Sequence, residues 1–425
     1  MFTIVHSGTE VGFMKIVFRA EPGYIMAYNL TDKKTMKVAG KNLNLLNQCL
    51  NDGYTNKCTD LLQEHGFISL DLPNQEKAQL KQLILECKET KAPLRAMKAP
   101  EIMNIELTTR CPLRCPQCYC DLNQGQDIEK EVALKYLKEA AHLKIPFINL
   151  SGGETLVYPH LNELLEYISK HGLNSAIAIS GWGFDKARLE ELKKAGVDEI
   201  YVSLNGSTPE INGLSRDGYE MAINSLHLLQ ADGQVDYYIN WVARNDNVQD
   251  FPHLVILAQK YGAKGIVILV SKPDASYVLQ ATLSKDNFLM LAHYLKNHNQ
   301  EAMPIQVEPC FSPLRAYINN NYLFNRNIGF NKGCGAGRNA MAVDVDGNLI
   351  PCRHLLYPES FESIEDYWWH SRVLNQLRQF EDYRQEPCQS CYLNNNCISC
   401  RAVADKVEKN LFSGNNYCSA REIAQ

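Results

Sequence analysis

Three cysteines, Cys111, Cys115 and Cys118, form a CxxxCxxC pattern directly after a strand-like run that ends at Leu107. Iron–sulfur clusters are held by cysteine thiolates, normally four for each [4Fe–4S] cluster. A loop with only three thiolates leaves one iron with an open position, where a small ligand can bind. The alternatives for this loop are a structural zinc site and three buried cysteines.

Seven further cysteines gather towards the C-terminal end of the sequence. In chain order they are Cys334, Cys352, Cys388, Cys391, Cys397, Cys400 and Cys418. The second of them follows a predicted hairpin whose turn is Asp346-Gly347. Two CxxC pairs in a reducing compartment indicate metal binding or catalysis. A zinc site with four thiolates would leave the other cysteines idle, and disulfides are the remaining alternative.

Strands and helices alternate between residues 101 and 300. Strands are expected at 102–107, 147–150, 175–179, 199–204, 237–242 and 265–270. Helices are expected at 129–143, 161–171, 184–195, 219–230 and 251–261. Strict alternation of this kind implies an α/β fold with a parallel sheet and right-handed crossovers.

The three-cysteine loop and the turn from Ser151 to Glu154, which follows the second strand, resemble the radical S-adenosylmethionine (SAM) enzymes. The resemblance implies a partial (β/α)6 barrel of the TIM type, with its working groups at the C-terminal ends of the strands. In that family the open iron binds the amino and carboxylate groups of SAM. Electron transfer from the cluster then cleaves SAM to a 5′-deoxyadenosyl radical.

The same resemblance implies which residues contact SAM. They are Tyr119, Gly152, Gly153, Glu154, Ser203, Asn205 and Arg216. The Gly-Gly-Glu turn matches the motif that holds the methionyl amine, and the tyrosine would flank the adenine. Ser203 or Asn205 would contact the ribose, and Arg216 would pair with the carboxylate through its bidentate fork. The alternatives are that Ser203 only caps a strand end and that Arg216 is an exposed loop residue.

Two positions depart from the pattern of the family. Asn205 stands where an aspartate is common, and the stretch from Ser180 to Gly183 replaces the usual Thr-Asn-Gly. The role of this second loop, with Trp182, is therefore open. Cys120 is also unusual, and we expect it to pack because the motif already supplies three thiolates.

The C-terminal cysteines resemble the SPASM domain, which carries two auxiliary [4Fe–4S] clusters. The ligation in that family would assign Cys334, Cys352 and Cys400 to one cluster, with Cys310 as the candidate fourth ligand. The other cluster would take the four remaining cysteines, which are Cys388, Cys391, Cys397 and Cys418. Only two residues separate the last CxxC pair, where the family has three. Without Cys310, the first auxiliary cluster would have an open iron.

The first ninety residues predict a small α+β unit. Turn signals separate three short strands at 14–18, 24–28 and 35–38, and two helical patterns and an apolar strand at 67–70 follow. This order resembles the winged-helix domain called the RiPP recognition element, which captures the leader of a ribosomally made peptide as an extra strand. A purely structural cap is the alternative. Balanced charges disfavour a DNA-binding winged helix.

Composition restricts the class of protein further. The 425 residues are 45% hydrophobic and 21% charged, with a net charge of −5. These values are ordinary for globular domains and argue against broad nucleic-acid binding. No apolar run approaches the length of a membrane span. Residues 1–20 lack the pattern of a signal peptide, so we expect a cytoplasmic protein.

Three domains are expected: a peptide-binding unit at 1–90, a radical SAM barrel at 91–304 and a SPASM domain at 305–425. The resemblance implies an oxidoreductase that cleaves SAM and cross-links a ribosomally made precursor peptide through a thioether or carbon–carbon bond. Its partners would be the precursor peptide with its leader and an electron donor such as flavodoxin or ferredoxin. The alternatives are a protein oxidase resembling anaerobic sulfatase maturases and a non-catalytic iron–sulfur or zinc scaffold.

Overall fold

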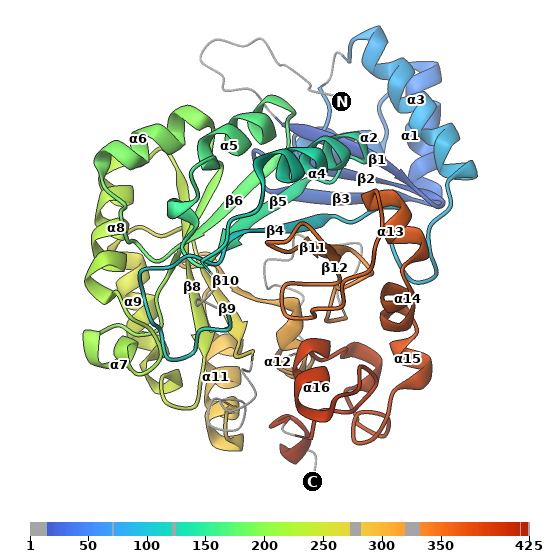
Figure 1. Ribbon diagram of the computed structural model, residues 1–425. Helices are drawn as coiled ribbons and strands as arrows, with labels where there is room; N and C mark the ends of the chain where they lie inside the picture. The colour runs from blue at the N-terminus through green and yellow to red at the C-terminus, as the bar shows by residue number, and fades with distance from the viewer. Residues whose placement is uncertain are drawn as a thin grey trace.

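A nine-stranded sheet forms the centre of the structure, a computed structural model (Figure 1). The structure describes residues 15–69, 72–120, 125–272, 282–318, 332–416 and 418–423. Across the sheet the strand order is β10-β9-β8-β7-β6-β5-β4-β11-β12. Six parallel strands follow one another in chain order: β4 (Ile102–Thr108), β5 (Phe147–Gly152), β6 (Asn174–Ile179), β7 (Glu199–Ser203), β8 (Asp236–Ala243) and β9 (Ile266–Val270).

Helices alternate with these strands. The long ones are α4 (Lys130–His142), α5 (Leu161–Lys170), α6 (Lys186–Ala195), α8 (Tyr219–Asp232) and α9 (Phe251–Lys260). Three short ones lie in the connecting loops: η1 (Thr155–Val157), α7 (Pro209–Gly213) and η2 (Val248–Asp250). The predicted alternation of strands and helices is confirmed, and so is the α/β class.

The sheet extends beyond the six predicted strands at both edges. At one edge β10 (Ile305–Val307), which follows α11 (Lys285–Asn297), pairs in parallel with β9. At the other edge β11 (Ala340–Val343) pairs in parallel with β4 and antiparallel with β12 (Leu349–Ile350). The predicted hairpin is therefore confirmed. It also joins the cysteine-rich part of the chain directly to the barrel sheet.

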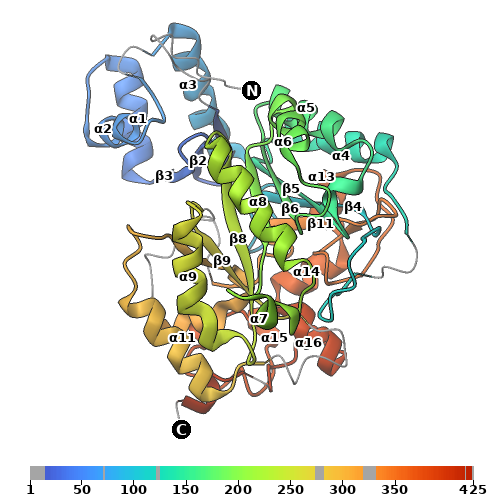
Figure 2. The ribbon, with the colours of Figure 1, turned by 90° about the vertical axis from the view of Figure 1, so that its left-hand side faces the viewer.

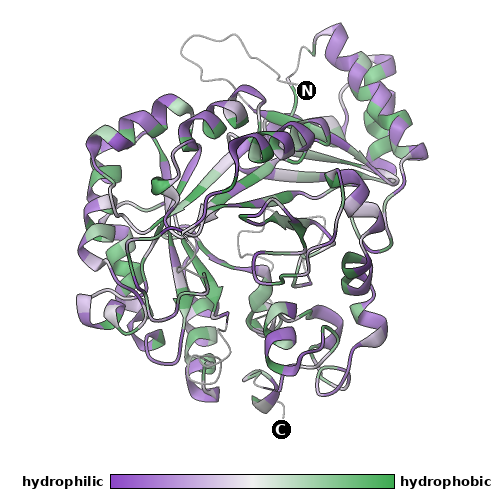
Figure 3. Ribbon diagram, viewed as in Figure 1, coloured by the Kyte–Doolittle hydropathy of each residue, from purple (hydrophilic) through white to green (hydrophobic). Residues whose placement is uncertain are grey.

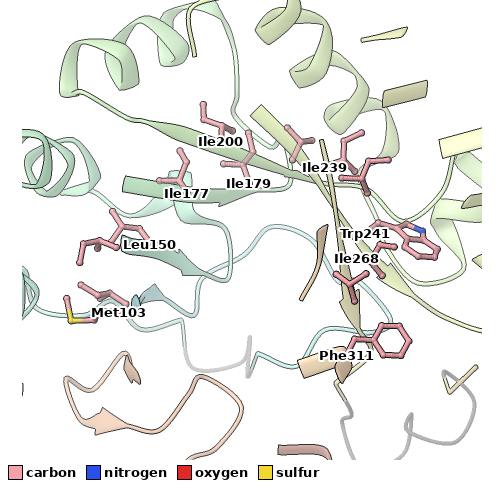
Figure 4. Close-up of a cluster of buried hydrophobic side chains, with 14 of the residues drawn as sticks. Met103, Leu150, Ile177, Ile179, Ile200, Ile239, Trp241, Ile268 and Phe311 are labelled. Atoms are coloured by element: carbon pink, nitrogen blue, oxygen red, sulfur yellow. The ribbon is translucent and has the colours of Figure 1, made fainter. Parts of the chain in front are cut away.

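The two faces of the sheet differ because side chains alternate along a strand. One face forms a continuous hydrophobic core with the helices, and Figure 3 shows the hydrophobic residues of the strands beneath helices that also carry hydrophilic residues. Along β8, burial alternates from Tyr237 to Ala243, and Tyr238 and Asn240 keep partial exposure. The second face therefore lines an accessible, polar interior. Figure 4 shows core residues that include Met103, Leu150, Ile177, Ile200, Ile239, Trp241 and Ile268.

The N-terminal unit is an antiparallel sheet with three helices. Its strands are β1 (Ile16–Glu21), β2 (Tyr24–Asn29) and β3 (Lys34–Ala39), with β2 in the middle. Its helices are α1 (Lys41–Asp52), α2 (Lys57–Glu64) and α3 (Asn74–Glu89). The predicted strand at 67–70 is wrong over 67–69, because Phe67 and Ile68 are buried in the core of this unit without pairing in a sheet. Residues 14 and 70 lie outside the described residues.

This N-terminal sheet packs against the beginnings of the barrel strands (Figures 1 and 2). One of its faces contacts α1–α3, and the other places Tyr28 against Phe147 at the start of β5. Lys33 forms ion pairs with Glu199, at 3.4 Å, and with Asp236, at the starts of β7 and β8. Because both faces are covered, only the edges of the sheet can accept another strand.

The cysteine-rich C-terminal part lies across the molecule from α5, α6 and α8 (Figure 1). It is anchored by hydrogen bonds from the Trp368 indole to the Met97 carbonyl, at 2.9 Å, and from the Ile364 N–H to Glu139 of α4, at 2.6 Å. No helix in the described part of the chain is both long and apolar enough to span a membrane. The helices here are η3 (Pro309–Phe311), α12 (Ser312–Ile318), α13 (Ile364–His370), α14 (Arg372–Arg378), α15 (Phe380–Tyr383), η4 (Asn394–Asn396), α16 (Arg401–Glu408) and η5 (Arg421–Ile423).

Candidate active site

The three-cysteine loop leaves the C-terminal end of β4 and is held by the segment that follows α7. The Asp217 N–H donates to the Cys115 sulfur at 3.4 Å, and the Asp217 carboxylate accepts from the Arg114 N–H at 2.8 Å. The Gln117 N–H donates to the Ser215 carbonyl at 3.3 Å. The loop conformation therefore depends on a segment that enters between β7 and α8.

Gly152 and Gly153 are required because the backbone of β4 and of the cysteine loop comes very close to them. A Cβ atom at Gly152 would lie 2.3 Å from the Thr108 carbonyl oxygen, and one at Gly153 would lie 2.3 Å from that of Arg110. The Gly153 N–H also donates to the Thr108 carbonyl at 2.6 Å. In the described residues, the group that approaches these glycines is thus the protein backbone itself.

Glu154 is buried at the end of β5 and is oriented by Ser180, the residue after β6. Its carboxylate accepts hydrogen bonds from the Ser180 N–H, at 2.8 Å, and from the Ser180 hydroxyl. Burial raises the pKa of Glu154 above the ordinary carboxyl value, and the bonds from Ser180 and the charge of Arg216 offset part of this shift. The loop from Ser180 to Gly183, whose role the sequence left open, therefore positions this glutamate.

Ser203, Asn205 and Arg216 come together on the wall opposite β5. The Arg216 Nε donates to the Ser203 carbonyl at 3.1 Å, and the charge of Arg216 acts on Cys115 and Cys118. The amide of Asn205 is used inside the protein: it donates to Ser215 at 2.9 Å and accepts from the Val242 N–H at 3.0 Å. This suits Asn205 to hold the loop, and leaves Ser203 as the better candidate for the predicted ribose contact.

Tyr119 connects the cysteine loop with the C-terminal hairpin. Its ring centroid lies 4.2 Å from that of His354 and 5.0 Å from the Arg353 guanidinium carbon. Both partners directly follow Cys352, the second cysteine of the C-terminal group. The residue that follows Cys118 therefore contacts the two residues that follow Cys352. The sequence did not indicate this contact between the two cysteine-bearing segments.

Cys120 lies beside the three-cysteine loop without belonging to its pattern. Its sulfur lies 3.8 Å from Glu106 Oε1 and 3.6 Å from the Gly152 carbonyl oxygen. A hydrogen bond from Cys120 lowers the pKa of Cys118 to about 6. This thiol therefore supports the thiolate form of a predicted ligand.

Cys310, Cys334, Cys352 and Cys400 form the first C-terminal group. Hydrogen bonds from Cys310 lower the pKa of Cys334 to about 6 and also lower the pKa of Cys400. Burial raises the pKa of Cys352 to about 12, and the neighbouring Cys334 and Cys400 add to this rise. Cys310, the uncertain member in the sequence, thus lies together with the other three.

Cys388, Cys391, Cys397 and Cys418 form the second group. Burial raises the pKa of Cys418 to about 12, with further contributions from Cys397 and Cys388, and Cys397 is also influenced by Cys391. All fifteen cysteines lie in the described residues, and none of them forms a disulfide. The structure thus brings the eight C-terminal cysteines together in two groups of four.

Comparison with protein families agrees with this geometry. Residues 105–258 match the radical SAM superfamily, and residues 334–392 match SPASM, an iron–sulfur cluster-binding domain. The chain therefore belongs to the radical SAM enzymes that carry a SPASM domain. Enzymes of this class use a SAM-binding [4Fe–4S] cluster together with auxiliary clusters.

Particular relatives share most of this chain. The PqqA peptide cyclase of Methylorubrum extorquens is 28% identical over 321 residues, which cover 71% of this chain and 79% of that protein. The PqqA peptide cyclase of Ruegeria pomeroyi is 25% identical over 317 residues, which cover 71% and 82%. Streptococcus suis SuiB bound to S-adenosylmethionine matches with a TM-score of 0.71 at 16% identity, over 95% of this chain and 98% of SuiB. This last likeness concerns the fold.

The residues present suit the cofactors of this class. Backbone N–H groups donate to sulfurs in two of the cysteine groups, from Asp217 to Cys115 and from Asn415 to Cys388, at 3.4 and 3.2 Å. Such bonds stabilise thiolates and tune iron–sulfur clusters. Among the described residues, no three His, Cys, Asp or Glu side chains meet the geometry of a single-ion site. When bound, SAM and its cluster would supply a 5′-deoxyadenosyl radical, and the chain's own residues would orient SAM and enclose the space between the cysteine groups.

Several residues of this site were missed from the sequence. Glu106 and Lys272 lie at the C-terminal ends of β4 and β9, and Arg353 and His354 follow Cys352. Two signals could have indicated them: a carboxylate inside an apolar strand, and charged residues directly beside a cluster cysteine. Lys272 is half-buried, and both oxygens of Glu308 accept from its ammonium group at 2.7 Å.

Proposed function

We propose that the chain oxidatively cross-links a ribosomally made precursor peptide, forming a thioether or carbon–carbon bond. The observation that carries this proposal is the combination of a SAM-type cysteine loop, two sets of four C-terminal cysteines and an N-terminal sheet with an open edge. The relatives named above are peptide cyclases, and one structure that matches at a TM-score of 0.69 is SuiB bound to its precursor peptide SuiA.

The proposed division of the chain follows the predicted boundaries. Residues 1–90 would bind the leader, 91–304 would hold SAM and residues 305–425 would hold the auxiliary clusters. Cys111, Cys115 and Cys118 would bind the first cluster, and each group of four C-terminal cysteines would bind one auxiliary cluster. The contacts of Cys310 with Cys334 and Cys400 support four protein ligands on the first auxiliary cluster.

The edge at β3 is the proposed site of the leader peptide. β1 is buried along its whole length, whereas β3 pairs, among the described strands, only with β2 and exposes Lys34 and Lys37. An unpaired edge presents free backbone donors and acceptors to an incoming strand. A leader bound there would be tethered to the barrel through the contacts of the N-terminal sheet.

The oxidation requires electrons to enter and to leave. We place the reaction in the cytoplasm, where a flavodoxin or ferredoxin would reduce the SAM-binding cluster. Fifteen cysteines without disulfides suit a reducing compartment. After the radical abstracts a hydrogen atom from the peptide, bond formation releases one proton and one electron, and an auxiliary cluster would accept that electron.

A maturase acting on a whole protein is the second candidate. The structure of anSMEcpe with AdoMet and the Cp18Cys peptide matches with a TM-score of 0.58, over 76% of this chain and 94% of that one. The match with SuiB extends over 95% of this chain. The wider match with SuiB and the N-terminal sheet favour a precursor peptide as substrate. A purely structural scaffold is disfavoured because the chain belongs to a family of enzymes.

The test is co-expression of the enzyme with each short peptide encoded beside its gene, followed by mass spectrometry of the peptide. We expect a peptide that has lost two hydrogen atoms and yields a cross-linked fragment. A Cys111/Cys115/Cys118→Ala triple variant serves as the control and should leave the peptide unmodified. Formylglycine in a co-expressed sulfatase, with every short peptide unchanged, would replace this proposal with the second candidate.

A further inference from the structure

Arg353, His354 and Tyr119 form a cluster of polar side chains between two predicted cluster sites. Tyr119 follows Cys118 of the SAM-binding loop, and Arg353 and His354 follow Cys352 of the first C-terminal group. Their contacts, 4.2 Å between the two rings and 5.0 Å from the Arg353 guanidinium carbon to the Tyr119 ring, hold them together. A group bound by these side chains would lie between the SAM-binding loop and the first C-terminal group of cysteines.

Two polar atoms of this cluster lack a hydrogen-bond partner among the described residues. The Arg353 Nε and the Tyr119 hydroxyl are buried without a hydrogen-bond partner in the described part of the chain. Glu106 acts on Arg353 only through its charge and forms neither a hydrogen bond nor an ion pair with it. Native proteins rarely leave a buried polar atom without a hydrogen bond, because its desolvation is then uncompensated. The arrangement is therefore complete only when a ligand supplies acceptors.

The hydrogen-bond donors of this cluster indicate which chemical group can bind there. A guanidinium carries five N–H groups in a planar fork that matches a carboxylate, and a tyrosine hydroxyl adds another donor. The imidazole of His354 packs against the Tyr119 ring, and one of its ring nitrogens can add a further donor. Several donors gathered around one guanidinium fit a carboxylate.

Two carboxylates can reach this region, that of SAM and that of the substrate. Arg216 approaches Cys115, Cys118 and Glu154 from the wall formed by β7. It is thus placed to pair with the carboxylate of SAM. The charge of Arg353 also acts on Cys118, but Arg353 comes from the C-terminal hairpin. Of the two arginines, Arg216 is the one that acts on Cys115 and Glu154 as well. We therefore assign the hairpin arginine to the substrate.

We propose that Arg353, with Tyr119 and His354, forms a subsite for the carboxylate of an acidic residue in the substrate peptide. The proposal rests on the proposed function, since it names a chemical feature of that peptide. An aspartate or glutamate side chain held by Arg353 would stand beside the SAM-binding loop. Arg353 would then determine which residue of the peptide faces the radical.

The test uses capped amino acids, so it does not depend on knowing the peptide. N-acetyl-glutamate methylamide, its aspartate analogue and N-acetyl-glutamine methylamide are titrated calorimetrically into the reconstituted, SAM-saturated enzyme. We expect one of the acidic probes to bind at least about tenfold more tightly than the glutamine probe, as for a buried charge-assisted pair. Equal affinities for the acidic and neutral probes would overturn the proposal. This outcome is measured on the wild-type enzyme alone and needs no variant.

Variants assign the binding to Arg353 and identify the source of the carboxylate. Arg353→Gln should lower affinity for the acidic probe at least about tenfold and leave SAM affinity and iron content unchanged, whereas Arg353→Lys should retain part of the affinity. Arg188→Gln, which changes a partly exposed arginine of α6 in another part of the barrel, is the matched control. A loss of SAM affinity in Arg353→Gln with unchanged probe binding would assign the arginine to SAM and overturn the proposal. Probe binding without cross-linking of any peptide would contradict the proposed function and leave the subsite intact.

Discussion

Ser180 and Glu154 show how a residue outside the recognised motifs orients one inside them. Glu154 belongs to the Gly-Gly-Glu turn, yet its carboxylate is held by the backbone and hydroxyl of Ser180 on the neighbouring strand end. Gly152 and Gly153 are needed for the close approach of the backbone of β4 and of the cysteine loop. The motif therefore works only when β4, β5 and β6 end at the same level.

Removal of the Ser180 hydroxyl should weaken SAM binding. Ser180→Ala keeps the N–H donor and removes one bond to the carboxylate that is proposed to hold the SAM amine. We expect a loss of about 1 kcal/mol, roughly fivefold in affinity, in equilibrium binding of SAM to the reconstituted enzyme. Ser175→Ala removes a hydroxyl at the opposite end of β6 and should leave SAM affinity unchanged. An equal loss in both variants would attribute the effect to general destabilisation.

The role of Cys310 can be separated from that of Cys120 by iron content. Both are half-buried next to predicted ligands, but of the two only Cys310 contacts two members of a C-terminal group. With three four-iron clusters bound, the reconstituted wild type should hold about twelve irons. Cys310→Ala should lower this content and alter the spectrum of the first auxiliary cluster, whereas Cys120→Ala should keep about twelve. A full complement in Cys310→Ala would leave that cluster with three protein ligands.

At the scale of elements, β3 is the edge of the N-terminal sheet at which we propose that the leader peptide binds. One face of this sheet is covered by α1–α3 and the other by the beginnings of the barrel strands. Pairing at β3 would therefore extend the sheet by backbone hydrogen bonds. The segment after α7 has a comparable role for the cysteine loop, because Asp217 and Ser215 fix its backbone.

Backbone methylation of the leader peptide tests pairing at β3. In a paired strand, alternate N–H groups point towards the partner, so only every second one is used. We expect N-methylation at one position of the bound segment to lower affinity at least about tenfold, while methylation at the adjacent position has little effect. Fluorescence anisotropy of labelled leader with the full-length enzyme measures both. Equal effects at adjacent positions would exclude strand addition.

At the scale of the whole molecule, Glu101 ties the three parts of the chain together. Its carboxylate accepts from the Tyr28 hydroxyl of β2, at 2.8 Å, and from the Asn339 amide just before β11, at 2.9 Å. It lies directly before β4, and its exposure is 0%. Burial raises its pKa, and the charge of Arg19 and the two hydrogen bonds offset part of the rise. The junction of the parts is thus a buried carboxyl group.

This junction predicts a pH dependence of stability. Because the pKa of Glu101 is higher in the folded state, its contribution is fully present below the ordinary glutamate pKa of about 4.3. The contribution is lost as the pH rises through the folded-state pKa. Glu101→Gln should therefore become more stable relative to wild type as the pH rises above about 4.3. The full gain should be about 1.4 kcal/mol for each unit by which folding raises the pKa of Glu101.

Urea unfolding of both proteins at a series of pH values measures this difference. Glu365→Gln, which changes an exposed carboxylate of α13, is the control and should show no such trend. A constant difference between Glu101→Gln and wild type across the pH series would contradict the assignment of the shift to Glu101.

The sequence by itself determined the features that depend on local spacing. Alternation of apolar runs specified the six parallel strands and their helices, because burial against one face imposes a period on the residues. The CxxxCxxC loop, the Gly-Gly-Glu turn and the C-terminal cysteines specified the class of enzyme. The strand predicted at 67–70 was wrong because an apolar run indicates burial but not the element that is buried. Phe67 and Ile68 are buried among helices rather than in a sheet.

Only the tertiary structure decided which distant residues meet. Pairing of β11 with β4 places Arg353 and His354 against Tyr119, and the loop after β6 places Ser180 on Glu154. It also grouped Cys310 with Cys334, Cys352 and Cys400. Such contacts join strand ends and loops that are far apart in the chain. Neither the local periodicity nor the residue spacing of one segment indicates which distant residue it contacts. They are set by the register of the sheet and by the packing of the C-terminal part against it.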